Sequence, residues 1–171
     1  MTAPAGKRLT GHGLAVGLPA RWEGRIYRRV VDTGQFGKQQ PGKQHAFGWP
    51  GELSHPILHL ANFALPAARG DFGTGAVELM GPEHVFVALL EFGADCLGTA
   101  LYAPVGVPRV RPGQFNPSGM QRRVAGQAGF QHFFTEANRP FCLYVVIGSH
   151  RQAVPLAKQV NAVLSQIEVQ P

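Results

Sequence analysis

The stretch GFQHFFTEANRPFCLYVVIG, residues 129–148, decides the fold of this 171-residue chain. It contains two strongly apolar runs, GFQHFFTE and PFCLYVVIG, which are joined by the turn-forming residues ANRP at 137–140. In the second run alternate residues fall on opposite faces: Phe141, Leu143, Val145 and Ile147 on one, Cys142, Tyr144 and Val146 on the other. A strand that is apolar on both faces belongs inside a sheet that is covered on both sides.

The residues that follow predict a helix. Leu156, Val160, Val163 and Ile167 recur at helical spacing and form one apolar stripe, while polar residues take much of the opposite side. Pro155 cannot donate a backbone hydrogen bond, so we place it near the first helical position, with a short turn before it.

Upstream of this pair of elements, the pattern predicts further short strands. We expect strands at 13–18, 25–31, 55–65, 75–80 and 84–92, a short helix or turn at 95–103, and a connection at 104–127. The fold class that follows is α+β: a mostly antiparallel sheet of about six strands, packed by a C-terminal helix.

The length of the chain predicts one domain with a core large enough to need no disulfides. We expect residues 1–10 to be a flexible tail and residues 11–171 to form the α+β domain. Within it, residues 32–54 hold five glycines and two prolines, which predicts a long turn-rich excursion at the surface.

Composition excludes several classes of protein. The two cysteines, Cys96 and Cys142, lie 46 positions apart without a CxxC pair, so neither a zinc knuckle nor a disulfide scaffold is expected. No run approaches the ~20 apolar residues of a membrane helix, and no signal peptide is apparent. The sequence therefore predicts a cytoplasmic protein that does not insert into a membrane, and it carries no cofactor signature.

The stretch GKQQPGKQ, residues 37–44, resembles a phosphate-binding loop in its glycine spacing and its lysine. A functional loop of this kind needs Ser or Thr after the lysine and a helix downstream. Gln44 takes the hydroxyl position, and the following residues HAFGWPG do not form a helix. We interpret the stretch as a flexible turn.

The charge balance allows an anion-binding alternative. The chain has 16 Lys and Arg against 10 Asp and Glu, a net charge of +6, which favours acidic partners. The arginines that could contact phosphates are Arg109, Arg111, Arg122 and Arg123. Nucleic acid is the less favoured partner, because these pairs are not interleaved with the aromatic residues on which bases stack.

A small hydrolase or metal enzyme is the second alternative. His55 and His59 would hold one metal ion only on a helix, whereas Pro56 and the neighbouring residues favour a strand, where the two lie ~13 Å apart. Glu78 and Glu83 are the carboxylates that such an enzyme could use. The glycine-rich run RGDFGTG, residues 69–75, is interpreted as a connection in which Asp71 has a turn role.

A protein-binding surface is the interpretation that we favour. Phe36, Phe47 and Trp49 lie in the turn-rich excursion, where no periodic core pattern accounts for them, and exposed aromatic residues often anchor interfaces. Arg25, Arg28 and Arg29 would form a polar rim. The alternative is that Trp49 packs over the core.

Both ends of the chain resemble a known superfamily. The opening GLAVGLPARWEG (13–24) is similar to the strand–Pro–Trp start of the PsbP-like fold, and the hairpin at 129–149 followed by PLAKQVNAVLSQIEV (155–169) resembles its ending. The resemblance implies an α/β/α sandwich and a binding module without shared catalytic residues, which presents a sheet face or edge to a protein partner. We therefore expect a non-enzymatic accessory, adaptor or chaperone-like protein of the bacterial cytoplasm.

Overall fold

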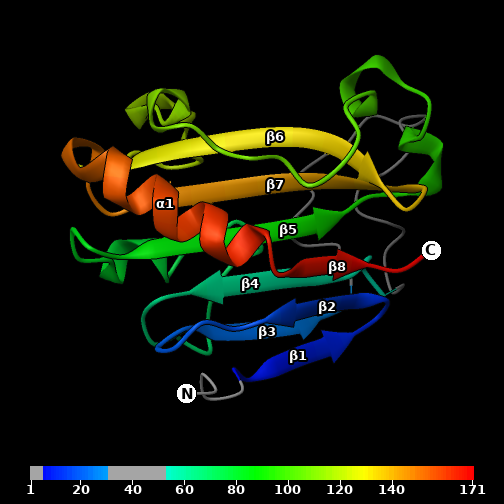
Figure 1. Cartoon of the computed structure of the whole chain (residues 1–171), viewed down its shortest axis with the longest axis horizontal. Helices are drawn as coiled ribbons and strands as arrows, with labels where there is room; N and C mark the ends of the chain where they lie inside the picture. The colour runs from blue at the N-terminus through cyan, green and yellow to red at the C-terminus, as the bar shows by residue number, and fades with distance from the viewer. Residues whose placement is uncertain (1–5, 31–52) are drawn as a thin grey trace, which may run out of the picture.

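The computed structural model describes residues 6–30 and 53–171 as eight strands, one α-helix and several 3₁₀ turns (Figure 1). One sheet has three strands in the order β1 (Arg8–Gly11), β2 (Leu14–Gly17), β8 (Ile167–Val169). The other has five, in the order β3 (Glu23–Tyr27), β4 (Ile57–Ala61), β5 (Val85–Glu91), β7 (Arg139–Ile147), β6 (Ala128–Glu136). All of these strand pairs are antiparallel, which confirms the α+β class.

The five-stranded sheet has a buried cluster on each face. Phe141, Leu143, Val145 and Ile147 of β7 join the cluster under α1 (Ala153–Leu164) and the small sheet, and Cys142, Tyr144 and Val146 join the second cluster. Loop residues 63–80 and 92–102 contribute to that second cluster. The prediction that this strand lies inside a sheet covered on both sides is confirmed.

The helix α1 begins as the sequence predicts. A 3₁₀ turn at His150–Gln152 precedes it, and Pro155 lies in its first turn, where a missing N–H costs no helical hydrogen bond. The helix ends at Leu164, before the last residue of the predicted apolar stripe. Ile167 lies instead in β8, opposite Val16 of β2, and is still buried in the same core.

Two parts of the strand prediction differ from the structure. The strands form two sheets rather than one sheet of about six. Residues 75–80 form no strand but a 3₁₀ turn at Val77–Leu79, because Gly75 has φ +90° and its N–H is bonded to the Glu78 carboxylate.

The N-terminal strand was missed by the sequence pattern. β1 begins at Arg8, inside the segment that was expected to be a flexible tail. Its four residues carry one apolar side chain, Leu9, so period-two alternation gives little signal. The turn at His12 and Gly13, both with positive φ, folds β1 back onto β2.

None of the helices in the described part of the chain is long and apolar enough to cross a membrane. The residue ranges 1–5 and 31–52 lie outside the described part, and they include most of the turn-rich excursion and the whole GKQQPGKQ stretch.

Candidate functional site

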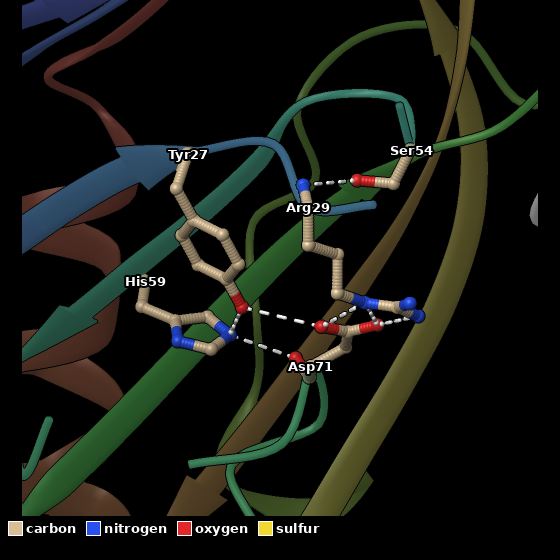
Figure 2. Close-up of polar contacts among 5 residues, drawn as sticks. All are labelled: Tyr27, Arg29, Ser54, His59 and Asp71. Atoms are coloured by element: carbon tan, nitrogen blue, oxygen red, sulfur yellow. Dashed lines mark hydrogen bonds and ion pairs between the residues drawn. The ribbon is translucent and has the colours of Figure 1, made fainter. Parts of the chain in front are cut away.

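A polar cluster lies where β3 and β4 meet the loop that carries Asp71 (Figure 2). Arg29 follows β3 and forms a forked ion pair with Asp71: Nη2 to Oδ2 is 2.5 Å and Nε to Oδ2 is 2.8 Å. Both side chains are partly buried. The planar guanidinium group has the shape that binds a carboxylate through two hydrogen bonds. The pair fastens the 62–76 loop to the end of β3.

His59 of β4 occupies the centre of this cluster, and its contacts define its tautomer. The Arg69 Nε–H donates to Nδ1 at 2.8 Å, and the Asp71 backbone carbonyl lies 2.7 Å from Nε2, so Nε2 must carry the proton. Burial, helped by the nearby Arg69 charge, lowers the pKa of His59 to about 4, although the Asp71 backbone carbonyl and the Asp71 charge act to raise it. The ring is therefore neutral at pH 7.

Tyr27 and Ser54 complete the cluster. The Tyr27 hydroxyl donates to Asp71 Oδ1 at 3.3 Å, and burial, followed by the Asp71 charge, raises the pKa of Tyr27. The Ser54 hydroxyl accepts from the backbone N–H of Arg29 at 3.0 Å, and the Ser54 carbonyl accepts from Arg28 Nε at 2.7 Å. These bonds hold the two chain segments together on either side of residues 31–52.

The polar cluster is arranged for structure rather than for proton transfer. A general base needs a free nitrogen within reach of a substrate, and both ring nitrogens of His59 are bonded to Arg69 and Asp71. The cavity beside Arg29, Ser54 and Asp71 has a volume of about 10 Å³, the space of roughly one water molecule. The arrangement can fix backbone segments, and as far as the described residues define it, this cavity has no room for a substrate.

The residues proposed for a metal or hydrolytic site are dispersed. Glu78 accepts the Gly75 N–H, Glu83 lies 3.7 Å from His84, and His55 precedes β4 at the edge of the small cavity. Within the described residues, no three histidine, cysteine or carboxylate side chains come close enough to hold a metal ion.

The predicted protein-binding residues fall into two sets. Phe36, Phe47 and Trp49 lie outside the described residues. Of the three rim arginines, Arg28 and Arg29 are bonded to Ser54 and Asp71, whereas Arg25 is exposed and donates to the carbonyl of its neighbour Gly24. The Arg29 side chain therefore takes part in an ion pair within the protein.

The four arginines of the anion-binding alternative are all exposed, but they do not line one cavity. Arg109 and Arg111 lie beside α1, where Lys158 joins them. Arg123 lines a different cavity and donates to Ser118 Oγ at 2.5 Å; Arg122 lines neither of these two cavities.

Sequence reasoning missed the role of Asp71. Asp71 lies in a turn, as predicted, and its carboxylate in addition pairs with Arg29 across 42 positions of the chain, which the pattern did not indicate. The available signal was the basic strand RIYRR, because a part-buried arginine in it needs an anionic partner. Which carboxylate becomes that partner depends on the path of the loop after β4, and the sequence pattern does not indicate that path.

A second feature is the outer edge of β6, the last strand of the five-stranded sheet. Near each end of β6 the edge is occupied by the 104–127 connection. Gly129 exchanges two hydrogen bonds with Asn116, and Thr135 bonds to Pro104 and Gly106. The direction of the backbone N–H and C=O groups alternates along a strand. The backbone groups of Gln131 and Phe133 therefore point outward from the sheet, like those of Gly129 and Thr135. No described residue bonds to their outward N–H and C=O groups.

The connection leaves this middle part of the edge open because it crosses the helix side of the sheet. Val110 is buried there, and its N–H and C=O are both bonded to the Asn161 side chain of α1. Phe115 is buried against Phe130 farther along. Figure 1 shows this segment passing across the face of β6 and β7.

Apolar side chains are exposed beside the open edge. Val105 is 83% exposed and Leu101 is 56% exposed. Val105 forms an isolated β-bridge with Thr135. Leu101 lies in the 3₁₀ turn Ala100–Tyr102, and the centre of the Tyr102 ring in this turn lies 5.5 Å from that of the Phe133 ring. We call Gln131, Phe133, Val105 and Leu101 the open β6 edge.

Comparisons of the chain with protein-family models, with curated proteins and with solved structures give no significant match.

Proposed function

We propose that the chain is a non-enzymatic protein-binding module of the bacterial cytoplasm, an accessory, adaptor or chaperone-like factor, and that it binds an extended segment of its partner along the open β6 edge. The observation that carries the proposal is the pair of outward-facing backbone N–H and C=O groups at Gln131 and Phe133, which no described residue bonds.

The dimensions of the open β6 edge suit a short strand. Gly129 and Thr135 are six residues apart, which corresponds to about 20 Å along a strand. A partner segment of about four extended residues fits between the two bridged ends. Its backbone would bond to Gln131 and Phe133, which is the way in which an added strand gains affinity.

Specificity would come from side chains at one end of the open β6 edge. Val105 and Leu101 are exposed, and the ring of Phe133 is partly buried beside them. An apolar partner residue that reaches this end would bury surface now in contact with water. We therefore expect the partner segment to carry apolar residues on the side that faces Val105.

The resemblance at the two ends of the chain supports the same function. The PsbP-like superfamily implies a binding module that presents a sheet face or edge to a protein, and β6 is such an edge. The aromatic residues Phe36, Phe47 and Trp49 lie outside the described residues and, together with the exposed Arg25, remain a second proposed contact surface for the same partner.

The test is capture of the partner from a lysate of the native host with the tagged protein and two variants. Gln131→Pro removes the outward N–H, and proline is tolerated where an edge strand faces solvent. Gln131→Ala keeps that N–H and removes the side chain. We expect the wild type and Q131A to retain a stoichiometric protein at high salt, and Q131P to lose it.

Salt distinguishes the main alternative. Binding of nucleic acid through the arginines falls steeply as salt rises, whereas strand addition is salt-tolerant. Nucleic acid that washes away with salt, with no protein captured, would overturn the proposal. Equal capture by Q131A and Q131P, with both variants folded by circular dichroism, would contradict the assignment to the β6 edge.

A further inference from the structure

A groove with a volume of about 500 Å³ lies between β8 and the 104–127 connection. Residues 167–169 of β8 form one wall, and residues 107–109 of the connection form the other. The end of α1 and Glu136 at the end of β6 complete the lining. Figure 1 shows β8 following the end of α1 on the same side of the five-stranded sheet. We call this feature the β8 groove.

The wall formed by β8 is an open strand edge, because β8 is the last strand of the three-stranded sheet. The Gln166 carbonyl and the Gln170 N–H bond to the two ends of β2, at Gly17 and Gly13. Since the direction of backbone groups alternates along a strand, those of Ile167 and Val169 point away from β2. No described residue bonds to these outward N–H and C=O groups.

Apolar side chains line the middle of the β8 groove. Val107 and Val169 are partly buried and pack against the main core cluster, in which Leu164 and Ile167 are buried. In a strand added to β8, the residues opposite Ile167 and Val169 would point to the same side of the sheet as those two side chains. Apolar residues at these two positions would therefore bury surface of the groove.

Opposite charges mark the two ends of the β8 groove. Glu136 lies at the Val169 end, because its register partner Arg139 donates to the Gln170 carbonyl at 3.0 Å. Arg109 lies at the other end, where the connection is bonded to the Asn161 side chain of α1. Neither Glu136 nor Arg109 forms an ion pair with a described residue, so both charges are available to an occupant.

We propose that the β8 groove binds an extended segment of another protein, antiparallel to β8, with a basic residue at its N-terminal end and an acidic residue at its C-terminal end. The antiparallel direction places the basic residue beside Glu136 and the acidic residue beside Arg109. Backbone bonds to Ile167 and Val169 would add a fourth strand to the small sheet. The second wall of the groove leaves room for a single strand, whereas a second copy of the chain would bring a whole sheet.

The experiment is a nuclear magnetic resonance titration of the full chain with the blocked peptide acetyl-KVTVE-amide. Its two valines take the positions opposite Ile167 and Val169. We expect the amide signals of Ile167 and Val169 to shift as their N–H groups gain partners. Those of Gln131 and Phe133, on the open β6 edge, should stay unchanged.

Neutral peptides and variants identify the two charged ends. The peptide KVTVE should bind roughly 2- to 5-fold more tightly than QVTVE, and Glu136→Gln should abolish this preference. KVTVE should exceed KVTVQ by a similar factor, and Arg109→Gln should abolish that preference. Arg111→Gln is the matched control, because Arg111 is exposed and does not line the β8 groove. It should keep both preferences.

Four results would overturn the proposal. They are no binding of KVTVE, shifts at Gln131 and Phe133 instead of Ile167 and Val169, equal loss of preference in R111Q and R109Q, and a peptide-free protein with the mass of two chains in which the Ile167 and Val169 amides are already protected. The last would assign the groove to a second copy. Since the titration reads β8 and β6 separately, its outcome does not depend on whether the open β6 edge binds a partner.

Discussion

At the scale of single residues, His59 links the stability of the fold to pH. Burial lowers its pKa to about 4, from an ordinary value of 6.5. Below pH 6.5 the unfolded chain takes up a proton at this histidine and the folded chain does not. We therefore expect the contribution of His59 to be complete above pH 6.5. It should fall by up to roughly 3 kcal/mol as the pH drops towards 4. Urea unfolding at a series of pH values measures it.

His59→Gln isolates this effect. Glutamine stays neutral over the whole range, so the unfolding free energy of H59Q should depend less on pH between 6.5 and 4. His12→Asn is the control, because His12 is exposed and its positive φ suits asparagine. The result that would contradict this prediction is an unfolding free energy of H59Q that depends on pH as steeply as that of the wild type. The pH dependence would then belong to other groups, such as His132, whose pKa burial also lowers.

At the scale of elements, the β6–β7 hairpin carries a strained turn. Ala137 and Asn138 join Glu136 to Arg139 with φ values of 49° and 59°, a region that disfavours alanine. Ala137→Gly should remove this strain. Glycine also loses more entropy on folding, and this loss offsets part of the gain. We therefore expect the unfolding free energy to rise by only about 0.5–1 kcal/mol. Thermal unfolding followed by circular dichroism gives the measurement.

Ala137→Val is the comparison for this turn. A β-branched residue is poorly suited to positive φ, so A137V should be less stable than the wild type. The order of stability expected is glycine, alanine, valine. If A137G is no more stable than the wild type, the turn does not hold Ala137 in the left-handed conformation.

Elements could be predicted where the apolar pattern was long. β7 and α1 follow from alternation and helical spacing over nine or more residues, and their positions in the core agree with the prediction. β1 has a single apolar side chain and pairs through a two-residue turn, so its four residues gave no pattern. The apolar residues at 75–80 suggested a strand, but the positive φ of Gly75 and the Glu78 carboxylate close a turn there.

At the scale of the whole molecule, the two candidate sites depend on how loops return to the sheets. The polar cluster brings together residues as far apart as Tyr27 and Asp71, and a local pattern cannot state that the 62–76 loop places Asp71 on Arg29. The open β6 edge likewise exists because the 104–127 connection bonds to β6 near its two ends and crosses the helix side between them. The sequence pattern predicted a connection at 104–127, but it did not predict where this connection runs over the sheet.

Hydrogen exchange at the amides of Gln131 and Phe133 tests the central claim most directly. Their N–H groups have no described partner, so we expect both to exchange rapidly in the free protein. Once the partner is bound, both should be protected, while the amides of Phe130 and His132, which point towards β7, stay protected throughout. Rapid exchange at Gln131 and Phe133 in the saturated complex would contradict the account.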